Sequence, residues 1–298
     1  MTTTMNRAAR SAARRSLQGL ALGDAFGRRW FPLFRERERA REEIRARRTP
    51  QEADWQWTDD TAMALAIHQI LERYGEVEQD RLAQAFARVY DADRARGYGH
   101  GMRMLLPRLL ADPAGWPSLA PELFDGGSFG NGASMRVAPL GAWFSADLAT
   151  VVRQAELSAR VTHAHPEGVA GAIAVAVAAA LSVRGGLTPA AVADRTPPGL
   201  VHDGLRRAAE LPLATEPGHA ADVLGSGQRV RADDTVPFAV WTATRHAGDL
   251  EAALWATAEG LGDVDTTCAI TGGIVAAATG VDAVPDAWLS RQEPLPGG

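Results

Sequence analysis

The amino-acid sequence predicts an all-α fold, a compact helical bundle that forms a single domain. Apolar residues recur at intervals of three and four along most of the chain. In residues 61–71, for example, Ala62, Leu65, Ala66 and Ile70 fall on one helical face. No stretch shows the sustained alternation of apolar and polar residues that a half-buried strand requires. The 298 residues are 46% hydrophobic and 22% charged, which is the composition of a globular protein.

Helical spacing defines the expected elements in chain order. They are residues 61–71, 81–90, 149–161, 168–183, 189–194, 201–211, 236–245, 250–259 and 266–278. Thr58 or Asp59 would cap the first, because short oxygen-bearing side chains accept hydrogen bonds from free amides at a helix N-terminus. Residues 169–183 are the most apolar segment. They fall short of the roughly 20 residues that cross a bilayer, so we expect a buried core helix and no membrane partner.

The two ends of the chain are expected to lie outside the folded domain. Residues 1–15 are basic and rich in Ser and Thr, and we expect a flexible N-terminal segment. The domain should extend over residues 16–285, and residues 286–298 should form a C-terminal tail. Loop-rich segments are expected at residues 97–101, 112–132 and 184–198, where glycine, proline and aspartate cluster.

Charge and residue usage exclude several classes of function. The net charge of −5 argues against a broad nucleic-acid surface. The chain contains no lysine, which rules out P-loop nucleotide chemistry and Schiff-base catalysis because both need a lysine amine. Its single cysteine, Cys268, leaves no intrachain disulfide and is compatible with a reducing cytoplasm. We expect a cytoplasmic monomer.

Two acidic motifs carry the chemical signal. The first is Trp57-Thr58-Asp59-Asp60-Thr61, and the second, about two hundred residues later, is Gly262-Asp263-Val264-Asp265-Thr266-Thr267. Each places two carboxylates and threonine hydroxyls at the start of a predicted helix. Ligand sets made only of oxygen suit hard divalent cations such as Mg²⁺ or Mn²⁺. The pair therefore predicts a site for two such ions built from both ends of the chain, which favours one domain. The simpler alternative is that all four aspartates only cap helices.

Further candidate residues lie in two glycine-rich segments. Residues 128–136, Ser-Phe-Gly-Asn-Gly-Ala-Ser-Met-Arg, let backbone amides approach an anion closely and offer an aromatic face for stacking. Near the N-terminus, Gly19, Gly23 and Gly27 recur every four positions and predict a helix face that packs tightly on a neighbour. Asp24 is then expected to be a buried, hydrogen-bonded carboxylate near the site.

Three charged or polar segments allow plainer interpretations. Residues 34–48 hold many arginines and glutamates and are expected to be a solvated loop or exposed helix, with a mobile flap over a phosphate-bearing substrate as the alternative. In Thr162-His163-Ala164-His165-Pro166, His163 is a candidate to contact substrate and His165 is expected to be structural. Asp233-Asp234-Thr235 is interpreted as a helix cap.

These motifs together resemble the ADP-ribosylglycohydrolase family. GLALGDAFG, WTDDTAMALAI, SFGNGASMRVAPLG, THAHPEG and GDVDTTCAITGGIVAAATG occur in that family's order and spacing, from about residue 16 to residue 280. The resemblance implies the family's compact all-α fold, a centre of two Mg²⁺ or Mn²⁺ ions, and hydrolysis of the bond that joins ADP-ribose to a protein side chain. The partners it implies are an ADP-ribosylated protein as substrate and ADP-ribose as product.

The resemblance also implies roles for individual residues. The matched metal ligands are Thr58, Asp59, Asp60, Asp263, Asp265 and Thr266. The matched substrate-binding residues are Ser128, Phe129, Gly130, Asn131, Gly132, Met135 and His163. Asp60 or Asp265 is the candidate catalytic group, which would take a proton from the attacking water.

One feature departs from the family pattern. Many relatives carry a glutamate in a flap shortly after the GDAxG motif, but here Arg28-Arg29-Trp30-Phe31-Pro32 follows Gly27, and the next carboxylate is Glu36. Three alternatives remain open. An aspartate of the metal motifs activates the water, Glu36 or a neighbour substitutes for the glutamate, or the protein binds ADP-ribose without cleaving it. The bond to arginine is the leading substrate, and Ser-linked, nucleic-acid or small-molecule aglycones are the alternatives.

Overall fold

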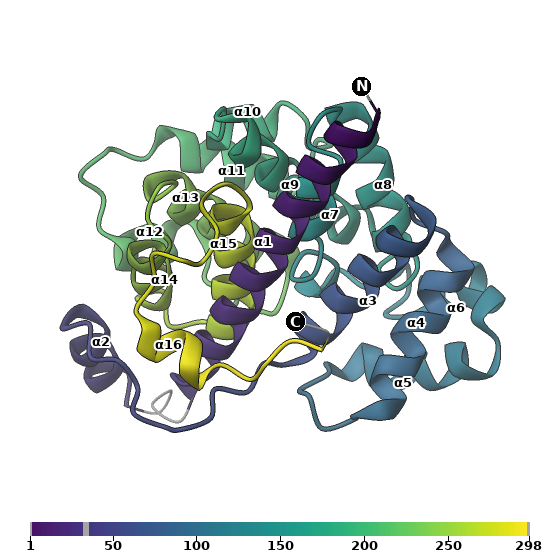
Figure 1. Cartoon of the computed structure of the whole chain (residues 1–298), viewed down its shortest axis with the longest axis horizontal. Helices are drawn as coiled ribbons and strands as arrows, with labels where there is room; N and C mark the ends of the chain where they lie inside the picture. The colour runs from purple at the N-terminus through teal and green to yellow at the C-terminus, as the bar shows by residue number, and fades with distance from the viewer. Residues whose placement is uncertain (1, 32–35, 297–298) are drawn as a thin grey trace.

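The computed structural model describes residues 2–31 and 36–296, and these residues form α-helices joined by loops (Figure 1). The helices within the described residues are α1 (Thr2–Arg28), α2 (Arg37–Arg45), α3 (Asp59–Tyr74), α4 (Gln79–Ala92), α5 (His100–Ala111), α6 (Trp116–Glu122), α7 (Ala138–Trp143), α8 (Leu148–Arg160), α9 (Pro166–Arg184), α10 (Pro189–Ala193), α11 (Leu200–Glu210), α12 (Pro217–Leu224), α13 (Ala232–Arg245), α14 (Leu250–Ala258), α15 (Val264–Thr279) and α16 (Asp286–Arg291). The same residues contain two isolated β-bridges and no strand, so the predicted all-α class is confirmed.

Every helix expected from apolar spacing is present, with ends shifted by a few residues. The expectation missed α5, α6, α7, α12 and α16, which are short or carry proline. Pro107 lies inside α5 and Pro121 inside α6, and proline inside a helix removes a backbone hydrogen bond and masks the sequence signal. Thr58 is the N-cap of α3, as predicted, because its hydroxyl accepts the Asp60 amide at 3.3 Å.

The most extensive contact between two helices of the described residues joins α1 to α15, which lie side by side in Figure 1. A Cβ built on Gly19 would lie 2.1 Å from the Cβ of Ala276, and one built on Gly23 would lie 2.1 Å from the carbonyl oxygen of Cys268. One built on Gly27 would lie 2.4 Å from the carbonyl oxygen of Val264. Only glycine permits this approach of two backbones. The predicted tight face is confirmed, and α15 is its neighbour.

Helix α9 forms the centre of the apolar core. Nearly all of its side chains from residue 168 to residue 182 are buried, and it packs against α7, α8, α13 and α15. It is long and apolar enough to cross a membrane, but 83% of its most apolar window is buried inside the protein. The expected core helix is therefore confirmed.

The ends of the chain do not lie outside the domain as expected. Helix α1 begins at Thr2, so the segment expected to be flexible is the first half of a long helix, and its Ala12 and Ala13 are buried. Helix length explains the difference, because the tightly packed second half fixes the axis along which the first half continues.

The expected C-terminal tail is likewise part of the fold. Trp288 of α16 is fully buried among aromatic rings and stacks on Phe26 with ring centroids 4.6 Å apart. The backbone of Trp55 is hydrogen-bonded to this segment twice: its amide donates to the Arg291 carbonyl, and its carbonyl accepts from the Glu293 amide. The C-terminal segment therefore completes an aromatic cluster in which Trp288 contacts Phe26, Trp55 and Trp255.

The glycine face of α1 leads to a stability prediction. Gly19→Ala should lower the free energy of unfolding by about 1–3 kcal/mol, because overpacking a close contact forces the backbones apart. Gly248→Ala is the matched control, since a Cβ there meets nothing within 4 Å. Chemical denaturation of both variants measures the effect. Equal stability of Gly19→Ala and wild type would show that the α1–α15 contact is looser than described.

Candidate functional site

A cavity of about 630 Å³ gathers the candidate residues. It lies where the N-termini of α3, α5 and α15 meet the loops before α7 and α13. Twelve of the thirteen predicted site residues line it: Asp59, Asp60, Ser128, Phe129, Gly130, Asn131, Gly132, Met135, His163, Asp263, Asp265 and Thr266. The exception is Thr58, which is buried and caps α3. Two segments about two hundred residues apart in sequence thus meet in one cavity, as expected.

The four motif aspartates form the acidic floor of this cavity. Asp59 and Asp60 occupy the first turn of α3, whereas Asp263 is the N-cap residue of α15 and Asp265 lies in its first turn. The positive ends of both helix dipoles therefore face the carboxylates and favour their charged form. Helix capping alone does not explain the arrangement, because the side chain of Asp263 makes no capping hydrogen bond.

Asp24 of α1 holds the first acidic motif in place. Its Oδ2 accepts hydrogen bonds from the Thr58 amide at 2.8 Å, the Thr61 amide at 3.2 Å and the Thr61 hydroxyl at 2.6 Å. Its side chain is fully buried, and burial raises its pKa to about 6 against the lowering effect of these hydrogen bonds. The expectation of a buried, hydrogen-bonded carboxylate near the site is confirmed.

Burial raises the pKa of every carboxylate in the acidic floor, and repulsion between neighbouring carboxylates adds to the shift at Asp59, Asp60 and Asp265. Burial, and then the charge of Asp24, raises the pKa of Asp59 to about 7. The same two causes hold the pKa of Asp60 well above its usual value, and for Asp265 the second cause is the charge of Asp263. Burial also raises the pKa of Asp263, although hydrogen bonds, first that from Asn131, oppose the shift. Each of these shifts favours the neutral form of a carboxylate, so added positive charge would stabilise the charged forms.

The donor chemistry of the acidic floor fits hard divalent cations. The six residues predicted as metal ligands all offer oxygen atoms, and Oδ2 of Asp60 is buried without a hydrogen-bond partner. A cation placed among these carboxylates would offset the repulsion that raises their pKa values. Within the part of the chain that the structure describes, no three His, Cys, Asp or Glu side chains already form a ready-made ligand set. The fit therefore rests on charge and donor type.

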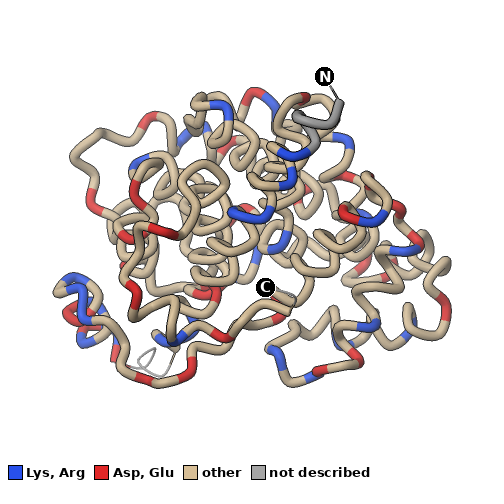
Figure 2. Tube along the Cα trace, viewed as in Figure 1, with Lys and Arg blue, Asp and Glu red and all other residues tan. Residues whose placement is uncertain are grey.

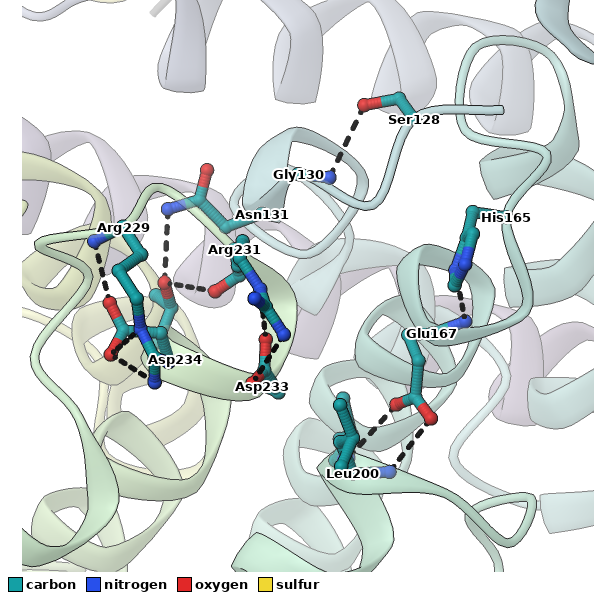
Figure 3. A network of polar contacts seen from close by, with 12 residues as sticks. Ser128, Gly130, Asn131, His165, Glu167, Leu200, Arg229, Arg231, Asp233 and Asp234 are labelled. Atoms are coloured by element: carbon teal, nitrogen blue, oxygen red, sulfur yellow. Dashed lines mark hydrogen bonds and ion pairs between the residues drawn. The ribbon is translucent and has the colours of Figure 1, made fainter. Parts of the chain in front are cut away.

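The glycine-rich loop reaches the cavity in a different way from the one expected. The Gly130 amide donates to Ser128 Oγ at 3.2 Å (Figure 3). The Asn131 amide donates to the Val230 carbonyl at 3.3 Å. Neither Gly130 nor Gly132 has a positive φ. The amides of Gly130 and Asn131 are thus already hydrogen-bonded within the protein. The prediction that these two amides bind an anion is therefore wrong. The Asn131 side chain instead donates to Asp263 Oδ2 at 2.8 Å and so links the loop to the acidic floor.

The glycines of the loop make room for His163. A Cβ built on Gly132 would lie 3.0 Å from both Cε1 and Nε2 of His163, and 3.9 Å from the sulfur of Met135. One built on Gly130 would lie 3.5 Å from the same Nε2. His163 is buried, and burial lowers its pKa to about 3. The imidazole is therefore neutral at ordinary pH.

Phe129 differs from the expectation of a free stacking face. Its ring stacks on His165 with centroids 4.5 Å apart and planes 10° apart, and the Arg231 guanidinium lies 4.3 Å from its centroid. His165 also caps α9 by accepting the Glu167 amide at 3.1 Å, so its predicted structural role is confirmed (Figure 3). The ring of Phe129 is thus already engaged by two protein groups.

The loop before α13 contributes cavity-lining residues that the sequence interpretation missed, namely Arg229, Val230 and Arg231. Asp233 and Asp234 are not caps as expected, since the N-cap residue of α13 is Arg231 and it makes no side-chain cap. Their carboxylates pair with guanidinium groups instead, Asp233 with Arg231 and Asp234 with Arg229 (Figure 3). The alternation Arg-x-Arg-x-Asp-Asp in the sequence was the available signal.

The opposite wall of the cavity comes from α5 and the loops around it. Residues of this wall are Gly97, Gly99, His100, Gly101, Met102 and Phe124. Phe124 has a φ of +53° and a side chain 61% exposed, which is an unusual backbone state for an aromatic residue. Residues 97–101, which were expected to be loop-rich, thus border the site.

The described part of the arginine-rich segment, residues 36–48, does not cover the cavity in this structure. Residues 34 and 35 lie outside the described residues, and the rest contain α2, which packs against α14 through the buried Ala40 and Ile44 and through an ion pair from Arg45 to Glu259. Basic and acidic residues alternate along α2 in Figure 2, and no described residue of the segment lines the cavity. Glu36 pairs with Arg39 instead. The exposed-helix interpretation is therefore confirmed for the described residues, whereas the ligand-dependent flap stays a prediction.

Comparison with known proteins gives the same family as the motifs. The family model of ADP-ribosylglycohydrolase matches residues 5–295. The human ADP-ribosylhydrolase ARH3 is 30% identical over 275 residues, which are 80% of this chain and 74% of that protein. The ADP-ribosylarginine hydrolase Tri1 of Pseudomonas putida (strain GB-1) is 25% identical over 290 residues, which are 94% of this chain and 73% of that protein.

A solved structure of an ADP-ribosylglycohydrolase-related protein complex has the same fold. It superposes with a TM-score of 0.66 at 23% identity and covers 96% of this chain and 94% of its own. The match of the family model extends through α1 and α16, which agrees with the packing of both ends of the chain. The protein therefore belongs to the ADP-ribosylglycohydrolase family.

Proposed function

We propose that this protein is a metal-dependent hydrolase that cleaves the glycosidic bond between ADP-ribose and an arginine side chain of a protein. Family membership supports hydrolysis of an ADP-ribose glycosidic bond. The observation that carries the metal part is the meeting of two distant acidic motifs in one buried cavity. The name of Tri1, an ADP-ribosylarginine hydrolase similar over most of this chain, supports arginine as the linkage.

The residues proposed to hold two Mg²⁺ or Mn²⁺ ions are Thr58, Asp59, Asp60, Asp263, Asp265 and Thr266. When bound, such ions supply positive charge that polarises ribose hydroxyls and lowers the pKa of a water molecule. The protein's own contribution is to exclude bulk water and to fix the carboxylates. Asn131 does the latter by donating to Asp263 at 2.8 Å.

Asp60 is the proposed acceptor of the water proton, with Asp265 as the alternative. Oδ2 of Asp60 is buried and has no hydrogen-bond partner, so it is free to accept a proton. The loop of residues 128–132 and His163 would orient the ADP-ribose so that its anomeric carbon lies near this oxygen.

A second candidate function is binding of ADP-ribose without cleavage. Among the described residues that line the cavity there is no glutamate, and Glu36 is paired elsewhere. This absence matters only if the flap glutamate of relatives is indispensable. The intact acidic floor favours catalysis, because four buried carboxylates are a costly arrangement for a protein that only binds a ligand.

A substrate panel tests the proposed function directly. Purified protein is offered arginine-linked, serine-linked and nucleotide-linked ADP-ribose with Mg²⁺, with Mn²⁺ and after EDTA treatment. We expect turnover of the arginine-linked substrate that disappears with EDTA and returns with either ion. Turnover that persists after complete removal of metal would refute the metal-dependent mechanism, and tight ADP-ribose binding with no turnover of any substrate would favour the second function.

Removal of one floor carboxylate should separate metal binding from folding. Asp60→Asn should reduce turnover at least about 100-fold, the upper range for lost support of a metal site, and should weaken Mn²⁺ binding in calorimetry. In EDTA the variant should unfold at no lower temperature than wild type, because it removes a repelling buried charge. Asp286→Asn, in the exposed first turn of α16, is the matched control. Unchanged Mn²⁺ affinity of Asp60→Asn would remove Asp60 from the proposed ligands.

The glycine loop should discriminate ligand binding from metal binding. Gly132→Val places a branched side chain where an added Cβ already lies 3.0 Å from His163, so it should weaken ADP-ribose binding more than Mn²⁺ binding. Calorimetry with each ligand measures the two affinities, and Gly248→Ala again serves as control. Equal ADP-ribose affinity in Gly132→Val and wild type would place the ligand elsewhere.

A further inference from the structure

Arg136 is a fully buried cation that the proposed mechanism does not use. Its side chain is 0% exposed, and no carboxylate of the described residues forms an ion pair with it. The guanidinium carbon lies 4.1 Å from the ring centroid of Phe86, and Nη1 contacts the sulfur of Met63. Burial lowers its pKa only to about 9, so it remains charged at neutral pH. An unpaired buried charge is expensive, which calls for a specific reason to keep it.

The polar contacts of Arg136 lead to the cavity. Nη2 donates to the Thr162 hydroxyl at 2.8 Å and to the Ser158 carbonyl at 3.4 Å. The same Thr162 oxygen lies 2.8 Å from Nδ1 of His163. A continuous chain of hydrogen bonds therefore connects a fixed cation to one nitrogen of the only histidine that the sequence interpretation placed in the site.

The direction of the hydrogen bonds from Arg136 through Thr162 decides which ring nitrogen of His163 carries the proton. Arg136 can only donate, so the Thr162 oxygen must accept from it. The Thr162 hydroxyl proton then needs an acceptor, and among the described residues the one within hydrogen-bond distance that can accept is Nδ1 of His163. A neutral imidazole has one acceptor nitrogen and one N–H. With Nδ1 as acceptor, the proton lies on Nε2.

Nε2 faces the space in which ligand is proposed to bind. It lies 3.0 Å from the Cβ position of Gly132 and 3.5 Å from that of Gly130, and all three residues line the cavity. Among the described residues, no atom forms a direct hydrogen bond with Nε2 of His163. Nε2 is also not one of the fully buried polar atoms that lack a partner. It is therefore open to the cavity.

We propose that Arg136 and Thr162 are positioning residues that fix His163 as the tautomer protonated on Nε2, so that His163 donates a hydrogen bond to an oxygen of bound ADP-ribose. The inference rests on the proposed function for the identity of the ligand. It explains why a charged arginine is kept in the core, since a cation at the start of the chain prevents the hydrogen bonds from reversing.

The test uses the isosteric change Thr162→Val, which removes the hydroxyl and keeps the shape. Thr162→Ser is the rescue variant because it restores the hydroxyl. Thr242→Val is the matched control, since Thr242 is equally buried, hydrogen-bonded to a helix carbonyl and absent from the cavity. Protein labelled with ¹⁵N-histidine reports by NMR which imidazole nitrogen of His163 carries the proton, and calorimetry reports ADP-ribose affinity.

We expect wild type and Thr162→Ser to show His163 protonated on Nε2 alone. Thr162→Val should show the proton shared with Nδ1 and an ADP-ribose Kd about tenfold higher, the weakening expected from one hydrogen bond. Thr242→Val should match wild type in both measurements even where it unfolds at a lower temperature. A merely structural role for the chain would lower stability in both valine variants and leave tautomer and Kd unchanged.

The outcomes separate this inference from the proposed function. The tautomer is measured in the ligand-free protein, so it decides the positioning role even where ADP-ribose binding is absent. Wild type with His163 protonated on Nδ1, or Thr162→Val with an unchanged tautomer, would overturn the inference. Wild type that binds no ADP-ribose, with the tautomer as expected, would instead overturn the proposed function and the ligand contact that depends on it.

Discussion

The site depends on the backbone contact between α1 and α15. Because glycines let the two helices touch, Asp24 on α1 and Asp265 on α15 are brought to the same end of one rigid pair. Asp24 then binds the N-terminus of α3 through Thr58 and Thr61, which sets the position of the first acidic motif. Three helices from opposite ends of the sequence are thus oriented by a single packed face. A side chain on that face would separate the acidic motifs as well as loosen the core.

The price of this arrangement is a cavity floor whose charges repel one another. Four motif carboxylates and Asp24 are buried together. Their pKa values are raised first by burial and, at Asp59, Asp60 and Asp265, also by repulsion. The fold offsets part of the cost with two helix N-termini and with Arg136, whose charge counts among the influences that lower the pKa of Asp59. What remains is a site of negative potential, and a cation is the simplest group that could satisfy it.

The sequence predicted the residues of the acidic floor better than it predicted where the folded domain begins and ends. Oxygen-bearing residues repeated at two helix starts identified the acidic floor, because residue type and position within a motif are local properties. Long-range contacts left weaker signals. Nothing in the sequence near Trp288 showed that it would stack on Phe26, and only charge alternation marked the pairing of Arg229 with Asp234. Composition alone left open whether residues 37–45 form a loop or an exposed helix, and their packing on α14 shows the helix.

The rim of the cavity is ordered before any ligand arrives. Arg231 is held by Asp233 and lies on Phe129, and Phe129 stacks on His165, which caps α9. The glycine-rich loop is therefore supported on one side by the core helix and on the other by the arginine loop. Because these contacts already fix the loop, ligand binding need not supply the conformational entropy of ordering it. The contacts that hold the glycine-rich loop in place are the same contacts that occupy the ring of Phe129. Selectivity for ADP-ribose must therefore come from the shape of the preformed cavity and from its hydrogen-bond donors.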